Sequence, residues 1–193
     1  MADDIDTKQA GDRRVPAQPP ADGIRLHIGG EEVREGWSIL NIQPGAGVDY
    51  VGSCTDLSAL ADGSCAEVYA SHVLEHLGYD RELPMALREI YRVLKPGGRF
   101  RLSVPDLDIL CRLFVHPGLT IEMRIDVMRI MYGGRTNPYD VHQVGLSFDF
   151  VGAFLTEAGF RDICRVPEFG MFNDTSSFRL GTQPISLNME AWK

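Results

Sequence analysis

The sequence predicts an α/β fold in which a mostly parallel, twisted sheet carries helices on both faces. Short apolar or alternating runs that end at glycine or proline recur in the first half of the chain, and such runs are typical of strands. Amphipathic runs at helical spacing follow after His72 and alternate with further strand patterns. Strands that alternate with helices are joined by crossovers, which set neighbouring strands parallel.

Four strands are expected before the first long helix: Ile24 to Gly30, Trp37 to Gly45, Val48 to Ser53 and Ala66 to Ser71. The first runs into a glycine pair, and Pro44-Gly45 stops the second. A turn is expected at Ala61 to Ser64.

The second half continues the alternation. Apolar residues at helical spacing predict a helix after His72 that Pro96-Gly97-Gly98 stops, and strict alternation then predicts a strand over Arg99 to Asp106. The remaining expected elements are helices at Asp106 to Phe114, Leu119 to Met131 and Ser147 to Ala158, and strands at Arg161 to Val166 and Ile185 to Trp192. A polar loop is expected over Tyr132 to Asp140.

Composition limits the domain organisation and the partners. Residues 1–22 are polar and rich in proline and alanine, which predicts a flexible tail, and residues 23–193 then form one domain. The formal net charge of -8 provides no surplus of basic groups to neutralise phosphates, so a nucleic acid partner is not expected.

The N-terminus and the cysteines indicate a cytoplasmic protein without a membrane segment. Acidic residues stand where a signal peptide needs basic ones, and no run is long and apolar enough to cross a bilayer. The four cysteines form no C-x-x-C pair, so we expect four reduced thiols in the core.

Three segments resemble the class I S-adenosylmethionine-dependent methyltransferases, and especially a group of small predicted methyltransferases of bacteria. They are YASHVLEHL at 69–77, REIYRVLKPGGRFRLSVPD at 88–106 and LHIGG at 26–30. The similarity extends over about residues 24–170. It implies the Rossmann-like methyltransferase fold and S-adenosylmethionine as the cofactor.

The resemblance also implies a set of cofactor-binding residues: Gly29, Gly30, Gln43, Asp56, Leu57, Ser71 and His72. A glycine turn after the first strand lets the backbone approach the cofactor closely. Gln43 stands where the family has an acid for the ribose hydroxyls, and Asp56 fits the position that accepts a bond from the adenine amino group.

The glycine loop departs from the family pattern. It reads GGEEVREG, where the family commonly has G-x-G-x-G, and Glu31 and Glu32 would repel the carboxylate of the cofactor. Gln43 also lacks the expected charge. The alternative is therefore a binding or scaffold module that keeps the fold and has lost the cofactor, and a pocket filled by Glu31 or Glu32 would favour it.

The expected reaction is methyl transfer to an oxygen or nitrogen of a small molecule or sugar. Such a transfer needs alignment and a base that removes a proton from the acceptor. His142, in YDVHQVG, is the first candidate base and His76 the second. A surface-loop histidine is the alternative interpretation of His142.

Two further patterns have competing interpretations. HVLEH at 72–76 matches the H-x-x-E-H zinc pattern, with His142 or Glu82 as a third ligand, but the same letters occur in the methyltransferase motif, so no metal is expected. Asp106 is either a base or the N-cap of the following helix, and capping is favoured. Phe172 to Ser177 either closes over a substrate or turns between strands.

Overall fold

The structure is a computed structural model that describes residues 22–193, so the predicted tail lies outside the described residues apart from Asp22. A seven-stranded sheet has the order β3-β2-β1-β4-β5-β9-β6, and every strand except β9 runs in the same direction. The strands are β1 (Ile24–Ile28), β2 (Ser38–Asn41), β3 (Tyr50–Val51), β4 (Cys65–Ser71), β5 (Leu94–Pro105), β6 (Arg161–Val166) and β9 (Ser186–Trp192). The predicted fold class is confirmed.

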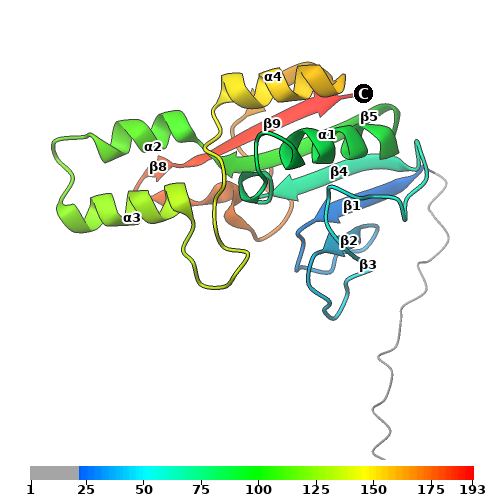
Figure 1. Ribbon diagram of the computed structural model, residues 1–193, viewed down its shortest axis with the longest axis horizontal. Coiled ribbons are helices and arrows are strands. Elements are labelled where there is room, and N and C mark those ends of the chain that lie inside the picture. Colours follow the sequence, from blue (N-terminus) through cyan, green and yellow to red (C-terminus); the bar gives the residue numbers. More distant parts are fainter. Residues whose placement is uncertain (1–21) are drawn as a thin grey trace, which may run out of the picture.

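Two helices cover one face of this sheet. α1 (Glu82–Val93) and α4 (Phe148–Ala158) lie side by side over the strands (Figure 1). Their apolar sides meet the alternate strand residues that point toward them, and together these form the main core. Its members include Leu26, Val68, Phe100, Leu102, Met189, Leu83, Leu87, Ile90 and Leu155.

Within residues 22–193 the helical cover of the opposite face is the short helix η2 (Thr175–Ser177), which contacts β5 and β9, so the two faces are covered unequally. The connections from β1 to β2 and from β2 to β3 are too short for a helix. The side chains on this face include an ion-pair network in which Glu67 and Glu190 contact Arg99 and Arg101. Charged pairs replace part of the apolar surface that a parallel sheet usually buries on both sides.

The segment 167–178 packs on the same face. Tyr69 donates a hydrogen bond to Asp174 at 2.6 Å, and its ring stacks on Phe172 with centroids 5.3 Å apart. His27 lies against Phe172 in the same aromatic cluster. This segment, which includes the short helix η2 (Thr175–Ser177), covers the sheet here, as a helix would in a doubly wound fold.

A helical pair extends beyond the carboxyl ends of the strands (Figure 1). α2 (Leu107–Phe114) and α3 (Ile121–Tyr132) pack on each other around a second small core of Leu110, Val127 and Ile185. The hairpin of β7 (Arg179–Leu180) and β8 (Gln183–Pro184), which the sequence analysis missed, adds Leu180 to this core.

Several element ends follow the sequence signals, and others do not. Asp106 caps α2, as expected. Ser147 caps α4, and Gly159 ends α4 in the left-handed conformation. In contrast, the segment after His72 forms only the short helix η1 (Leu74–His76) before α1 begins. α1 ends at Val93, so Pro96-Gly97-Gly98 lies within β5 and does not stop the helix.

The cysteines correct one further expectation. Cys54 and Cys65 are buried free thiols, but Cys111 and Cys164 are exposed, so the expected set of four core thiols is wrong for two of them. None of the helices in residues 22–193 has the length and hydropathy needed to cross a membrane.

Candidate functional site

Two pockets meet at the carboxyl ends of the parallel strands, where ligands of open α/β sheets bind. The first pocket has a volume of about 500 Å³ and lies at the ends of β1, β2 and β4. The second pocket, of about 480 Å³, lies between α3 and the segment after η2. His72, His76 and Asp140 line both pockets.

Gly29 lines the first pocket in a conformation that favours glycine. Its φ is +74°, and a Cβ built there would lie 2.5 Å from Cγ2 of Val73. Its N–H donates to the carbonyl of Leu40 at 2.7 Å. Gly30 does not line this pocket, because it is buried against His27, whose ring a Cβ would meet at 2.5 Å. The second glycine is therefore required by packing.

The end of β2 presents amides to the first pocket. Asn41 donates to the carbonyl of Gly30 at 3.2 Å and accepts from the N–H of Gln43 at 3.0 Å, so both ends of its amide are used. The side chain of Gln43 lines the pocket and makes no hydrogen bond to another residue within 22–193. Gln43 therefore offers a free donor and acceptor at the predicted position.

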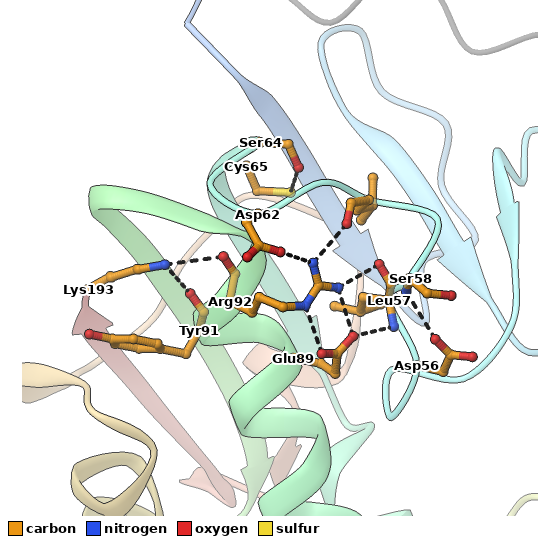
Figure 2. A network of polar contacts seen from close by, with 11 residues as sticks. Asp56, Leu57, Ser58, Asp62, Ser64, Cys65, Glu89, Tyr91, Arg92 and Lys193 are labelled. Atoms are coloured by element: carbon orange, nitrogen blue, oxygen red, sulfur yellow. Dashed lines mark hydrogen bonds and ion pairs between the residues drawn. The ribbon is translucent and has the colours of Figure 1, made fainter.

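Asp56 and Leu57 do not line the first pocket. They lie in a polar network around Arg92 of α1 (Figure 2). The carboxylate of Asp56 accepts from the N–H of Ser58 at 3.0 Å. Hydrogen bonding by the Ser58 hydroxyl, and next by this N–H, lowers the pKa of Asp56. Leu57 is buried in the core, and its N–H donates to Glu89 at 2.9 Å. Arg92 binds the carbonyl of Leu57 at 2.9 Å, which fixes this loop to α1.

Two residues just after β3 line the first pocket in the place expected for Asp56. They are Ser53 and Cys54, and the sequence analysis missed both. Ser53 accepts a hydrogen bond from the N–H of Thr55 at 3.2 Å, which turns the chain away before Asp56. The sequence signal that could have indicated Ser53 is its position, because Ser53 follows the third strand more closely than Asp56 does.

His72 stands between the two pockets with a left-handed backbone (φ 53°). Ser186 donates its hydroxyl proton to the carbonyl of Thr175 at 2.8 Å, so it must accept from Nε2 of His72 at 3.0 Å. Nδ1 of His72 then faces Oε1 of the buried Glu75 at 3.3 Å. Ser71 is half-buried beside it and lines neither pocket.

His76 and His142 lie together although the chain separates them widely. Their ring centroids are 4.8 Å apart and their planes nearly perpendicular. Nδ1 of His76 donates to the carbonyl of Val141 at 3.1 Å, which leaves Nε2 of the neutral ring with its lone pair. The N–H of Gln143 donates to the carbonyl of Glu75 at 2.7 Å and holds the His142 loop against η1.

Burial lowers the pKa of His142 below its ordinary value of 6.5, against an opposing effect of the Glu75 charge. The nearby rings of His76 and His72 lower it further. His142 is therefore held neutral at pH 7 and lines the second pocket with a basic nitrogen.

The zinc pattern does not assemble as the sequence alternative required. One ligand atom each from Glu75, His76 and His142 lie within 4.8 Å of one another, but His72 is engaged by Ser186 and Glu75. Glu82 accepts from the N–H of Gly78 at 2.9 Å and is absent from this group.

The two glutamates of the glycine loop do not fill the first pocket. Glu32 accepts from the N–H of Asn173 at 3.0 Å on the other side of the loop. Glu31 lines the pocket and leaves its volume of about 500 Å³ open. The condition that would have favoured a module without cofactor is not met.

Comparisons with known proteins agree with this geometry. Residues 33–102 match the family model described as a methyltransferase domain. None of the curated proteins matches the sequence.

Many solved structures share the fold. A SAM-dependent methyltransferase from Archaeoglobus fulgidus has a TM-score of 0.56 at 16% identity, covering 89% of this chain and 86% of its own. An S-adenosylmethionine-dependent methyltransferase from Mesorhizobium loti has a TM-score of 0.55 at 18% identity, and the match covers 90% of this chain and 93% of that one. The 1,6-didemethyltoxoflavin-N1-methyltransferase from Burkholderia thailandensis has a TM-score of 0.54 at 18% identity, and the match covers 88% of this chain and 70% of that one.

Proposed function

From the premise that this chain carries a class I methyltransferase domain, whose cofactor is S-adenosylmethionine, we propose that it methylates an oxygen or nitrogen of a small molecule or sugar. The observation that carries the proposal is the pair of pockets that adjoin at His72 and His76. One pocket can hold the cofactor while the other holds the acceptor, which gives the proximity that a displacement at the methyl carbon needs.

The first pocket fits the cofactor in its volume and in the polar groups that line it. Its volume of about 500 Å³ is in the range of small-molecule sites, and the missing Cβ of Gly29 keeps the end of β1 open. Gln43 and Ser53 offer hydrogen bonds to hydroxyl and amino groups. When bound, S-adenosylmethionine supplies a methyl group on a positively charged sulfur.

The second pocket fits a compact acceptor with both apolar and polar surface. Phe178, Leu180 and Ile185 provide the apolar side, while Asp126 and Arg129 provide charged groups. Its volume of about 480 Å³ suits a small molecule or a sugar ring. The net charge of -8 disfavours a nucleic acid acceptor.

The histidines remove the acceptor proton in this proposal. His142 is the first candidate, because it lines the second pocket and burial lowers its pKa. His76 is the second, since its Nε2 keeps a lone pair while Val141 holds Nδ1. With the cofactor bound as the methyl donor, the ring nitrogen of His142 or His76 would take up the proton that the acceptor loses.

Calorimetric titration of the purified chain with S-adenosylmethionine and with its demethylated product tests the cofactor assignment. We expect both to bind. Gly29→Ala, which introduces a Cβ 2.5 Å from Val73, should weaken binding at least about tenfold. Asp56→Ala is the matched control, because Asp56 lies outside the first pocket, and it should bind like the unmodified chain.

The second candidate function, a binding or scaffold module without cofactor, makes the opposite prediction. Its basis is the GGEEVREG loop and the amide at the end of β2. No heat with either ligand, from a folded sample at several temperatures, would establish this alternative and turn the search toward protein partners.

A further inference from the structure

We propose that α3 is the contact surface of a homodimer, in which a second copy of this chain packs against it in antiparallel orientation. The α3 stripe consists of Ile121, Ile125, Met128 and Tyr132, which are 66%, 46%, 42% and 60% exposed. At 3.6 residues per turn these side chains fall within about 60° of arc and extend over about 17 Å. Large apolar side chains aligned in this way are typical of a contact surface.

The stripe is separate from the side of α3 that packs on its own subunit. Val127 is fully buried against Leu110 of α2, and Ile130 and Met131 pack on the same small core. α3 is therefore apolar on two sides, and the second side has no cover within residues 22–193. Because the helical pair extends beyond the sheet, another molecule can reach this side (Figure 1).

The spacing of the stripe is self-complementary. Successive stripe residues are four, three and four positions apart, so the pattern is symmetric about a point between Ile125 and Met128. This spacing is the apolar repeat found where two helices pack along each other. A two-fold axis through that point sets Ile121 opposite Tyr132 of the partner subunit, and Ile125 opposite Met128 of the partner subunit. Such an axis closes the assembly at two copies.

The charges beside the stripe favour the same arrangement. Glu122 and Arg129 are both exposed and lie on the same flank of α3, seven residues apart. In an antiparallel pair this flank faces its own equivalent, so Glu122 comes within about 3 Å, measured along the axis, of the level of the partner subunit's Arg129. Two opposite-charge pairs then form across the axis.

The acidic chain makes a lipid surface the weaker choice of occupant. The net charge of -8 repels anionic lipid headgroups, and Glu122 borders the stripe itself. The contact also lies next to the second pocket, because Arg129 lines that pocket. Dimerisation therefore places Glu122 of the partner subunit beside Arg129, which lines the proposed acceptor site.

Sedimentation velocity of the full chain between about 5 and 200 μM tests the dimer. A seam of about 17 Å is small for a stable interface, so we expect a dissociation constant in roughly the micromolar range. Met128→Glu should weaken association at least about tenfold, since it buries an unpaired charge. Phe150→Glu, an equivalent change at an exposed position on α4, is the control and should dimerise normally.

Charge reversal tests the orientation. Glu122→Arg and Arg129→Glu should each weaken the dimer, and the double variant should restore it because the opposite pairs re-form. A double variant no better than the single ones refutes the antiparallel seam. The proposal is overturned if the chain is monomeric at every concentration. It is also overturned if the monomer co-sediments with neutral phosphatidylcholine vesicles through the α3 stripe. Circular dichroism shows whether each variant is folded.

Discussion

Asp106 offers a direct test of the distinction between a structural and a catalytic carboxylate at the end of β5. Its fully buried side chain accepts from the N–H groups of Asp108 at 3.1 Å and Ile109 at 3.3 Å, and it binds Arg165 at 2.9 Å. Loss of the cap costs about 1 kcal/mol, and loss of the charge near the helix N-terminus about 0.5 kcal/mol. The contact with Arg165, which stays 47% exposed, adds about 1 kcal/mol.

Asp106→Ala should therefore lower the free energy of unfolding by about 2–3 kcal/mol. Asp106→Asn keeps the cap and should lose only about 1–2 kcal/mol. Urea denaturation followed by circular dichroism measures both. Equal losses for the two variants would refute the capping argument, and so would losses below about 0.5 kcal/mol. A large loss of methyl transfer in a stable Asp106→Asn would instead make Asp106 the base.

The further predictions concern two histidines, His27 and His142. Burial lowers the pKa of His27 to about 4, so the unfolded chain takes up the proton first as the pH falls. The free energy of unfolding should therefore be at its full value above about pH 6.5 and should fall by about 3 kcal/mol by pH 4. Urea denaturation at several pH values measures this slope, and His27→Phe should remove it. Since burial also lowers the pKa of His142, kcat/KM should rise through an apparent pKa below 6.5 and stay level above it. His142→Gln should reduce kcat about 100-fold with cofactor binding unchanged, and a normal kcat in that variant would exclude His142 as the base.

The elements were predictable where local chemistry decides them. The cap at Ser147 and the left-handed Gly159 mark α4 in the sequence, and both act in the structure as expected. The side chains of the site were less predictable. Whether Ser53 or Asp56 faces the pocket depends on how one turn closes. The hydrogen bond from His72 to Ser186 joins residues 114 positions apart, so no local pattern indicates it.

The unequal cover of the two sheet faces was also present in the sequence as a signal. A parallel strand buried on both faces is a nearly continuous apolar run, whereas β5 alternates Arg99, Phe100, Arg101 and Leu102. This alternation predicts one polar face, and the expectation of two helical layers came from the fold class instead of from the strand.

The short connection after β1 changes the electrostatics of the first pocket. No helix follows β1, so Gly29 provides space for a ligand but no helix N-terminus behind it. The lining contains no lysine or arginine, and Glu31, Glu82 and Asp140 all border it. Such a pocket favours a cationic ligand over a neutral one. If the first pocket holds the cofactor as proposed, its acidic lining would bind the positively charged S-adenosylmethionine more tightly than the neutral sulfur of the demethylated product.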